Sequence, residues 1–105
     1  MQIHKKEEFG RRKQQLAQYA KAISHPARIA ILRKLAQDGK CICGELVVAL
    51  PLSQSTVSQH LKELKNAALI RGTFKGAKSI YSLNQHTIEM FRDEFKRLMN
   101  NLKDK

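Results

Sequence analysis

The sequence has no tryptophan, two prolines, two cysteines and nine acidic residues in a chain of 105. No apolar run approaches the roughly 20 residues that a membrane-spanning helix needs, so a membrane is not an expected partner. Residues 1–10 lack the apolar core of an export signal, and two cysteines cannot form the disulfide framework of a small secreted protein. These absences predict a protein that works in the cytoplasm.

The length and the overall composition predict a single domain. The 12.0 kDa chain is 42% hydrophobic and 28% charged, which is ordinary for a globular protein. It has no internal repeat and no low-complexity tract. We therefore expect residues 1–105 to form one domain.

The shortage of acidic residues is the strongest signal in the composition. Twenty Lys and Arg face nine Asp and Glu, which gives a net charge of +11. Such an excess makes a compact chain repel itself, so it usually serves a polyanionic partner. A nucleic acid, a membrane surface and an acidic protein are the candidate partners, and the absence of an apolar span disfavours insertion into a membrane.

The spacing of apolar residues predicts three helices in the first half of the chain. A basic amphipathic helix is expected over about residues 5–23, and a second helix over residues 26–38, with Pro26 in its first turn. A short third helix is expected over residues 44–50. The residues expected on the buried face of the second helix are Ile29, Leu32, Leu35 and Ala36.

A fourth helix is predicted to begin after Ser53, whose hydroxyl can accept a hydrogen bond from a free backbone N–H of the first turn. Val57, Leu61 and Leu64 recur at helical spacing and should form a buried stripe. The other faces are polar and poor in acid. They carry Gln54, Ser55, Thr56, Ser58, Gln59 and Lys62.

Two strands and a last helix complete the prediction. The strands are expected over residues 69–74 and 79–83, separated by a turn with a basic tip. The last helix, over residues 85–102, has apolar residues spaced 3, 4, 3 and 4 apart, which is typical of a helix–helix seam. The order α-α-α-α-β-β-α predicts a mainly α fold with a small β-hairpin wing, that is, a winged helix-turn-helix.

The third and fourth predicted helices fit a helix-turn-helix, because the second of the pair has a polar outer face. Gln pairs with adenine, Ser and Thr bond bases or phosphates, and Lys neutralises phosphate. Residues 53–78 hold five basic residues and one acid. We predict double-stranded DNA as the partner, contacted by Ser53, Gln54, Ser55, Thr56, Ser58, Gln59, His60, Lys62, Arg71, Lys75 and Lys78.

Within this set, the neutral side chains Gln54, Ser55, Thr56, Ser58 and Gln59 are expected to read bases, while Lys62, Arg71, Lys75 and Lys78 hold phosphate. A structural role is the alternative for His60. A winged helix that binds RNA or protein is the alternative for the whole chain. An enzyme is not predicted, because the sequence offers no nucleophile with a base, no acid pair, no phosphate-binding glycine loop and no metal triad.

At this point the sequence resembles the ArsR/SmtB family of winged-helix transcriptional repressors. Residues 25–32 (HPARIAIL) are similar to the second helix of the family, residues 52–64 (LSQSTVSQHLKEL) to its recognition helix, and residues 69–83 to its wing. The resemblance covers roughly residues 19–83. It implies a repressor, often of its own operon, that binds an imperfect inverted repeat as a homodimer and leaves it when an inducer binds.

The resemblance also implies that the first and last helices form the dimer interface. The two recognition helices would then lie about 34 Å apart, one turn of DNA. The seam of the last helix could instead pack within one chain. The residues expected at the dimer interface are Phe9, Leu16, Ile88, Phe91, Phe95, Leu98 and Leu102.

One position departs from the family. Members commonly have glycine where this chain has Ala68, at the end of the recognition helix. An alanine in the left-handed conformation there would cost roughly 1 kcal/mol.

Some family members bind soft ions through a Cys-X-Cys near the third helix, and Cys41-Ile42-Cys43 lies one residue before that place. Two thiolates are too few for a closed zinc or arsenite site, and the candidates for a further donor are His4, supplied by the partner chain, or Glu45. Three interpretations stay open for Cys41 and Cys43. They pack as small apolar side chains, which is favoured, or they respond to redox state, or they bind a soft metal or metalloid ion. No cofactor is predicted with certainty.

Other members bind zinc on the last helix through Asp-X-His with a distant histidine and acid. Here the first pair reads Asn84-Gln85-His86, and Arg97 and Asn100 stand at the distant positions. Asn and Arg are not zinc ligands of this kind, so that site is broken.

Overall fold

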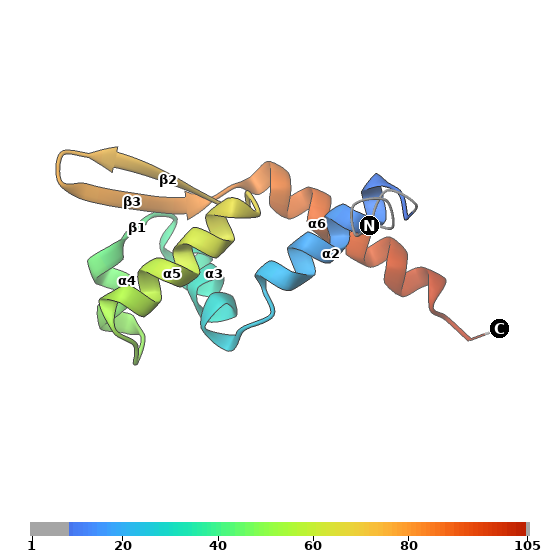
Figure 1. Ribbon diagram of the computed structural model, residues 1–105, viewed down its shortest axis with the longest axis horizontal. Helices are drawn as coiled ribbons and strands as arrows, with labels where there is room; N and C mark the ends of the chain where they lie inside the picture. The colour runs from blue at the N-terminus through green and yellow to red at the C-terminus, as the bar shows by residue number, and fades with distance from the viewer. Residues whose placement is uncertain (1–8, 105) are drawn as a thin grey trace, which may run out of the picture.

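The computed structural model describes residues 9–104 of the chain. Figure 1 shows α3, α4, α5 and the sheet gathered at one end of an elongated molecule, with α2 and α6 extending from it as an arm. Within the described range no helix is both long enough and apolar enough to cross a membrane. The elements are α2 (Arg11–Ala22), α3 (Pro26–Asp38), β1 (Cys41–Ile42), α4 (Cys43–Ala49), α5 (Gln54–Asn66), β2 (Ile70–Lys75), β3 (Lys78–Leu83) and α6 (Gln85–Asn101).

Helix α5 begins and packs as the sequence predicts. The Ser53 hydroxyl accepts a hydrogen bond from the Thr56 backbone N–H at 3.3 Å. Val57, Leu61 and Leu64 are at most 1% exposed, and the helix packs against α3 and α4. Burying such side chains contributes roughly 1.5–3 kcal/mol each, so this stripe decides how the helix is rotated about its axis.

The hydrophobic core surrounds that stripe. It draws on α2, α3, α4, the sheet and the turn after α5, so one core joins all the elements except the outer part of α6. Its other members are Tyr19, Ala22, Ile31, Leu35, Cys41, Leu46, Leu69 and Ile70.

The buried face of α3 differs from the prediction. Ile31 and Leu35 are fully buried, whereas Ile29 is 43% exposed and Ala36 is exposed. Leu35 is buried and Leu32 packs against the core, as predicted, so the prediction was wrong for Ile29 and Ala36 and missed Ile31. Apolar residues occupy so many positions of this helix that their periodicity allows two faces, and packing against α5 selects the one that contains Ile31.

The predicted hairpin is present, with β2 and β3 antiparallel from Ile70↔Leu83 to Lys75↔Lys78. Two residues, Gly76 and Ala77, connect the strands. Gly76 has a φ of 65°, the left-handed conformation that the first position of a type II′ hairpin turn requires. The basic tip therefore sits on a tight turn.

A third strand, β1, was not predicted. Its two residues pair with β3 through Cys41↔Tyr81 and Ile42↔Ile80, which gives the strand order β1-β3-β2. Two residues are too few to show any alternation in the sequence. Pairing with β3 creates this strand, and the strand holds the start of α4 against the wing.

The first described helix is shorter than predicted. Gly10 has a φ of 80° and caps α2, so the helix begins at Arg11 rather than near residue 5. Residues 5–8 and His4 lie outside the described residues. The other predicted boundaries agree with the structure to within one residue.

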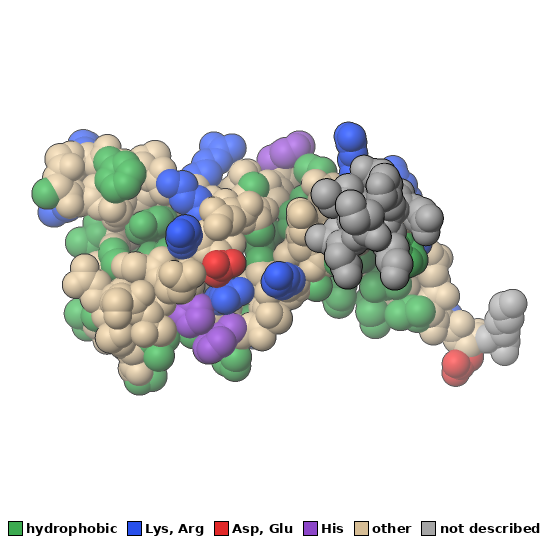
Figure 2. All heavy atoms as spheres, viewed as in Figure 1, with side chains coloured by type: hydrophobic (Ala, Val, Ile, Leu, Met, Phe, Trp, Pro, Cys, Tyr) green, Lys and Arg blue, Asp and Glu red, His purple; other side chains and the backbone are tan. Residues whose placement is uncertain are grey.

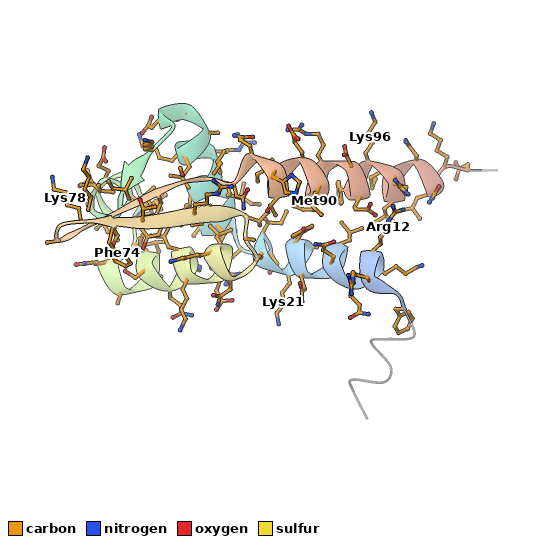
Figure 3. The ribbon with its side chains drawn as sticks, turned by 90° about the horizontal axis from the view of Figure 1, so that it is seen from above. Arg12, Lys21, Phe74, Lys78, Met90 and Lys96 are labelled. Carbon is orange, nitrogen blue, oxygen red and sulfur yellow. The ribbon has the colours of Figure 1, made fainter. Side chains whose placement is uncertain are left out.

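Helices α2 and α6 pack side by side along the arm (Figures 1 and 3). The rings of Tyr19 and Phe91 lie 5.2 Å apart, and those of Phe91 and Phe95 lie 6.0 Å apart. Farther out, the Arg12 guanidinium is 3.8 Å from the Glu94 carboxylate. These contacts join α2 and α6 within a single chain.

Helix α5 ends in a Schellman motif with alanine at the left-handed position. The Leu69 N–H donates to the Leu64 carbonyl at 3.1 Å, and the Ala68 N–H donates to the Lys65 carbonyl at 2.9 Å. Ala68 has a φ of 62°, the only positive φ of a non-glycine residue in the described chain. Glycine occupies this position without the clash of a Cβ atom.

We expect Ala68→Gly to raise the free energy of unfolding by about 1 kcal/mol, because it relieves the left-handed alanine. Urea unfolding followed by circular dichroism, at one fixed protein concentration, measures the change. Ala67→Gly is the matched control, since Ala67 has a φ of −84° and gains nothing from glycine. Equal destabilisation by both substitutions would contradict the prediction.

Candidate nucleic-acid interface

The polar face of α5 is exposed along its whole length. With Val57, Leu61 and Leu64 buried, the residues on the opposite side of the helix point away from the core. Those exposed residues are Gln54, Ser55, Thr56, Ser58, Gln59 and Lys62. The helix therefore presents amide, hydroxyl and ammonium groups to a partner, as the sequence predicts.

Three hydroxyl groups cluster at the first turn of α5. The Ser53 Oγ lies 2.9 Å from the Thr56 Oγ1 and 3.2 Å from the Ser55 Oγ. Each hydroxyl is both a donor and an acceptor, so this cluster can exchange its internal bonds for bonds to a base or a phosphate. The partial positive charge of the helix N-terminus favours an anion here.

Gln59 lies in the middle of the exposed face and is bonded within the helix. Its Nε2 donates to the Glu63 Oε1 at 3.2 Å. That bond leaves the Gln59 amide oxygen free of a protein partner among the described hydrogen bonds. Glu63 is half-buried and is the acid nearest to this face along the chain.

The wing adds basic groups at two different places. Arg71 sits at its base, where Nη2 donates to the Asn84 Oδ1 at 3.5 Å. Lys75 and Lys78 face each other across the tip and are exposed. Figure 3 shows Lys78 at the far end of the hairpin, directed away from α5.

The interface is almost free of acid. No Asp or Glu occurs between Glu63 and Glu89, although that stretch holds Lys65, Arg71 and the two tip lysines. Figure 2 shows Lys and Arg side chains near the C-terminal part of α5 and around the wing on one face of the molecule. A surface of this kind attracts a polyanion and binds it more weakly as salt is added.

His60 is an exception among the residues predicted to contact DNA. It is 7% exposed, and its Nδ1 accepts a hydrogen bond from the Arg28 Nε at 3.1 Å. Its ring lies 4.4 Å from that of His25, whose own Nδ1 accepts from the Ala27 N–H and caps α3. The structure favours the structural role for His60 over a DNA contact, because one turn of the helix places it beside the buried stripe.

Arg28 is an organising residue that the sequence did not reveal. Besides bonding His60, its Nη1 donates to the Ala22 carbonyl at 3.2 Å and the Lys21 carbonyl at 3.4 Å, at the end of α2. One side chain therefore links α2, α3 and α5. The only sequence signal is that Arg28 lies one turn before Ile31, on the buried face of α3.

Burial lowers the pKa of His60 below its usual value, and the nearby His25 and Arg28 lower it further. Glu63 acts in the opposite direction with a smaller effect. A neutral His60 is what the Arg28 bond requires, since a protonated ring has no acceptor nitrogen.

The two cysteines occupy different environments. Cys41 is 1% exposed and belongs to the core. Burial raises the pKa of its thiol, and the hydrogen bond to the Asp38 carboxylate, at 3.6 Å, raises it further. Cys43 is partly exposed, with its Sγ 3.8 Å from the Ser58 Oγ on α5.

These surroundings fit a soft-ion site poorly. The thiolate is the metal-binding form of cysteine, and the Cys41 environment opposes it. Within residues 9–104 no three His, Cys, Asp or Glu side chains are grouped so that they could hold an ion. Packing, the favoured interpretation, agrees with the burial of Cys41.

A second surface runs along the outer part of α6. Ile88 and Phe91 are half-buried and pack against the core of their own chain. This part of the helix therefore agrees with the alternative that the seam packs within one chain. Beyond them the apolar side chains are open: Phe95 is 47%, Leu98 39%, Met99 51% and Leu102 64% exposed. Leu16 is half-buried on α2, and Phe9, which precedes that helix, is 63% exposed.

Comparison with known proteins identifies the family. A family model described as "Bacterial regulatory protein, arsR family" matches residues 25–71. The HTH-type transcriptional repressor SmtB of Mycobacterium tuberculosis is 42% identical over 66 residues, which cover 63% of this chain and 48% of the repressor. The chain thus spans about half the length of that relative.

A second relative is covered more fully. The HTH-type transcriptional regulator Rv2034 of Mycobacterium tuberculosis is 37% identical over 76 residues, which cover 72% of this chain and 70% of the regulator. Among solved structures, the homodimeric winged helix-turn-helix DNA-binding domain of Mb0332 from Mycobacterium bovis superposes with a TM-score of 0.66. It is 24% identical, and the match covers 85% of this chain and 82% of that one. The winged-helix fold is therefore confirmed.

We expect the stability of the wild-type protein to fall more steeply than that of His60→Gln as the pH drops from about 7.5 to about 5.5. Because the pKa of His60 is lower in the folded chain, the unfolded chain takes up the proton first, near pH 6.5. The stabilisation is thus present above that pH and is lost as the pH falls through the folded-state pKa. Urea unfolding at a series of pH values measures both profiles.

The matched control is His86→Gln, because His86 is exposed on α6. It should keep the wild-type pH profile. Parallel profiles for wild type and His60→Gln would show that burial of His60 is not linked to stability.

Proposed function

Because this chain belongs to the ArsR family of bacterial regulatory proteins, we propose that it is a transcriptional repressor that binds double-stranded DNA as a homodimer. Helix α5 lies in the major groove and reads base edges, and the basic residues that follow it hold the phosphate backbone. A protein that binds the chromosome in this way acts in the cytoplasm and needs no catalytic group.

The observation that carries the proposal is the division of α5 into two faces. One face is buried by Val57, Leu61 and Leu64, which fixes the helix on the rest of the domain. The opposite face is exposed, rich in hydrogen-bonding groups, and followed by a stretch without acid from residue 64 to residue 88. A rigid helix with such a face suits the major groove of DNA.

Dimerisation through α2 and α6 supplies the second half of the site. The open apolar side chains of Phe95, Leu98, Met99 and Leu102 need a cover, and a contiguous apolar patch on a small protein marks an interaction surface. Mb0332, which has the same fold, is a homodimer. Two copies related by a two-fold axis would present two α5 helices to an inverted repeat, about 34 Å apart.

Sensing of a soft metal or metalloid ion through Cys41 and Cys43 is not part of the proposal. The described residues supply two sulfur atoms, one of them buried and hydrogen-bonded to Asp38. A closed site needs three or four donors. To bind an ion of that class, the protein would need a further donor from a second copy of the chain or from residues 1–8.

Fluorescence anisotropy tests the proposal directly. The probe is a labelled duplex from upstream of the gene for this protein, competed with a shuffled duplex of the same composition and with an RNA hairpin. A repressor should prefer the upstream duplex by at least about a thousandfold at physiological salt. Equal binding of all three would favour the alternative of an RNA-binding or protein-binding winged helix.

Two substitutions should separate the recognition of bases from the binding of phosphate. Gln59→Ala should lower the discrimination at one base pair by roughly 1–3 kcal/mol. Lys75→Ala should weaken binding to every duplex alike and reduce the slope of log affinity against log salt by about one. Anisotropy titrations over a series of single-base-pair variants and salt concentrations give both quantities.

Matched controls exist for both substitutions. Gln37 is exposed on α3 and Lys103 lies at the far end of the arm, so Gln37→Ala and Lys103→Ala should leave discrimination and salt slope unchanged. Wild-type behaviour of Gln59→Ala and Lys75→Ala in both measurements would remove these residues from the interface.

Phe95→Glu should separate the dimer, because a carboxylate would be buried without a partner in the seam. Light scattering should then give the monomer mass of 12.0 kDa. Phe95 is 47% exposed within one chain, so the monomer itself should stay folded. Lys96→Glu, one residue on and directed away from α2 in Figure 3, should keep the dimer. A dimeric Phe95→Glu protein would place the interface elsewhere.

A further inference from the structure

One exposed aromatic side chain on the wing has no role in the interface described so far. Phe74 is 77% exposed, the highest exposure of any aromatic residue in the described chain. It is the last but one residue of β2 and pairs with Ser79 of β3. An isolated exposed phenylalanine is ordinary on a protein surface, but Phe74 lies at the end of the wing beside the tip lysines.

Phe74 lies on the face of the hairpin that is directed toward α5. Alternation along β2 places Phe74 on the same face as Gly72, while Lys75 falls on the opposite face. A Cβ atom at Gly72 would lie 3.0 Å from the Tyr81 ring and 3.5 Å from the Lys65 Nζ of α5. Figure 3 agrees, because Phe74 points toward the side on which α5 lies and Lys78 does not.

The contrast with Gly72 shows that packing within the chain does not use Phe74. At Gly72 this face of the wing is filled by Tyr81, which packs against the core. Two residues farther out the hairpin has passed the edge of the core, and the phenyl ring is left in solvent. Because the ring stays in solvent, it does not gain the free energy of burial that stabilises the core residues.

The charge around Phe74 indicates what would cover it. Lys75 and Lys78 lie beside it at the tip of the hairpin, on the opposite face, and Lys65 of α5 lies near Gly72 on its own face. No acidic residue occurs between positions 64 and 88. An apolar group among cations fits a polyanion that also offers apolar surface. DNA has both, since its phosphates flank the sugar and base edges of the minor groove.

We propose that Phe74 makes an apolar contact in the minor groove beside the base pairs that α5 reads, and thereby favours operators with a deformable base step at that place. Apolar side chains that enter the minor groove partly unstack a base step, and pyrimidine–purine steps such as TA yield most easily. This inference rests on the proposed binding of duplex DNA. It adds a reader of DNA shape to the hydrogen-bonding face of α5.

The test uses the full-length dimer and anisotropy on the upstream duplex, with the base step under the wing changed to TA, to GC or to part of an A-tract. Wild type should bind the TA duplex about tenfold more tightly than the A-tract duplex. Phe74→Ala should bind the TA duplex about tenfold more weakly than wild type and lose most of the step preference. Its salt slope should stay at the wild-type value, since no charge is removed.

Phe74→Leu is the matched variant, because it keeps apolar bulk at the same place and should retain most of the preference. Lys75→Ala is the opposite control and should reduce the salt slope while leaving the step preference intact. Thermal unfolding of Phe74→Ala should match wild type, because the side chain lies outside the core.

The outcomes separate this inference from the proposed function. Loss of step preference at a constant salt slope in Phe74→Ala supports it. If wild type selects the upstream duplex and Phe74→Ala keeps the same affinity and step preference, the inference is wrong and the proposed function stands. A change of molecular mass in Phe74→Ala with unchanged affinity would assign the ring to a contact between copies. Failure of wild type to select any duplex would overturn both.

Discussion

Burial of the stripe formed by Val57, Leu61 and Leu64 is the constraint on which the rest of this structure depends. A helix that must bury one face has a fixed rotation about its axis, and the remaining residues then have to point outward. Helices α3 and α4 exist in their observed places because they cover this stripe. The exposed amides and hydroxyls of α5 are therefore held in register by apolar packing and not by contacts of their own, which leaves them available to a partner.

Arg28 extends that constraint to the arm. Its guanidinium donates to the last carbonyls of α2 and to His60 of α5, and a cation at a helix C-terminus is favoured by the helix dipole. The angle between α2 and α5 is thus set by directed hydrogen bonds as well as by packing. An inverted repeat of DNA has half-sites at a fixed spacing, so a domain that dimerises through its arm needs such a fixed angle.

The sequence predicted the features that depend on local chemistry. The Ser53 cap, the stripe of α5 and the turn at Gly76 each follow from residue type and spacing, and each is present. The left-handed position at Ala68 was indicated only by the resemblance to the family, whose members commonly have glycine there. The features that it missed depend on distant neighbours. Strand β1 exists only through pairing with β3, and Ile31 is buried on α3 where the helix packs against its neighbours. His60, for which a structural role was the alternative, is buried beside Arg28 and His25. In the sequence Phe74 is indistinguishable from an ordinary strand residue, because only the structure shows that the hairpin extends beyond the core at this position.

In the proposed complex, the distribution of charge along the interface would assign affinity and discrimination to different parts of it. Residues 53–61, which form the cap and the first two turns of α5, contain no Lys, Arg, Asp or Glu, and the basic residues begin at Lys62 and continue into the wing. Long-range attraction to phosphate is the same for every duplex and weakens with salt, whereas neutral hydrogen-bonding groups act only at contact and depend on the base they meet. Gln59 illustrates the second case in the proposed complex, because its amide oxygen and its second N–H remain available to a base while the other N–H is bonded to Glu63. The Glu63 bond limits the rotation of that amide, so a base with the matching donor and acceptor would find both groups in place and a mismatched base would leave one unpaired. The basic residues would add the same attraction for every duplex.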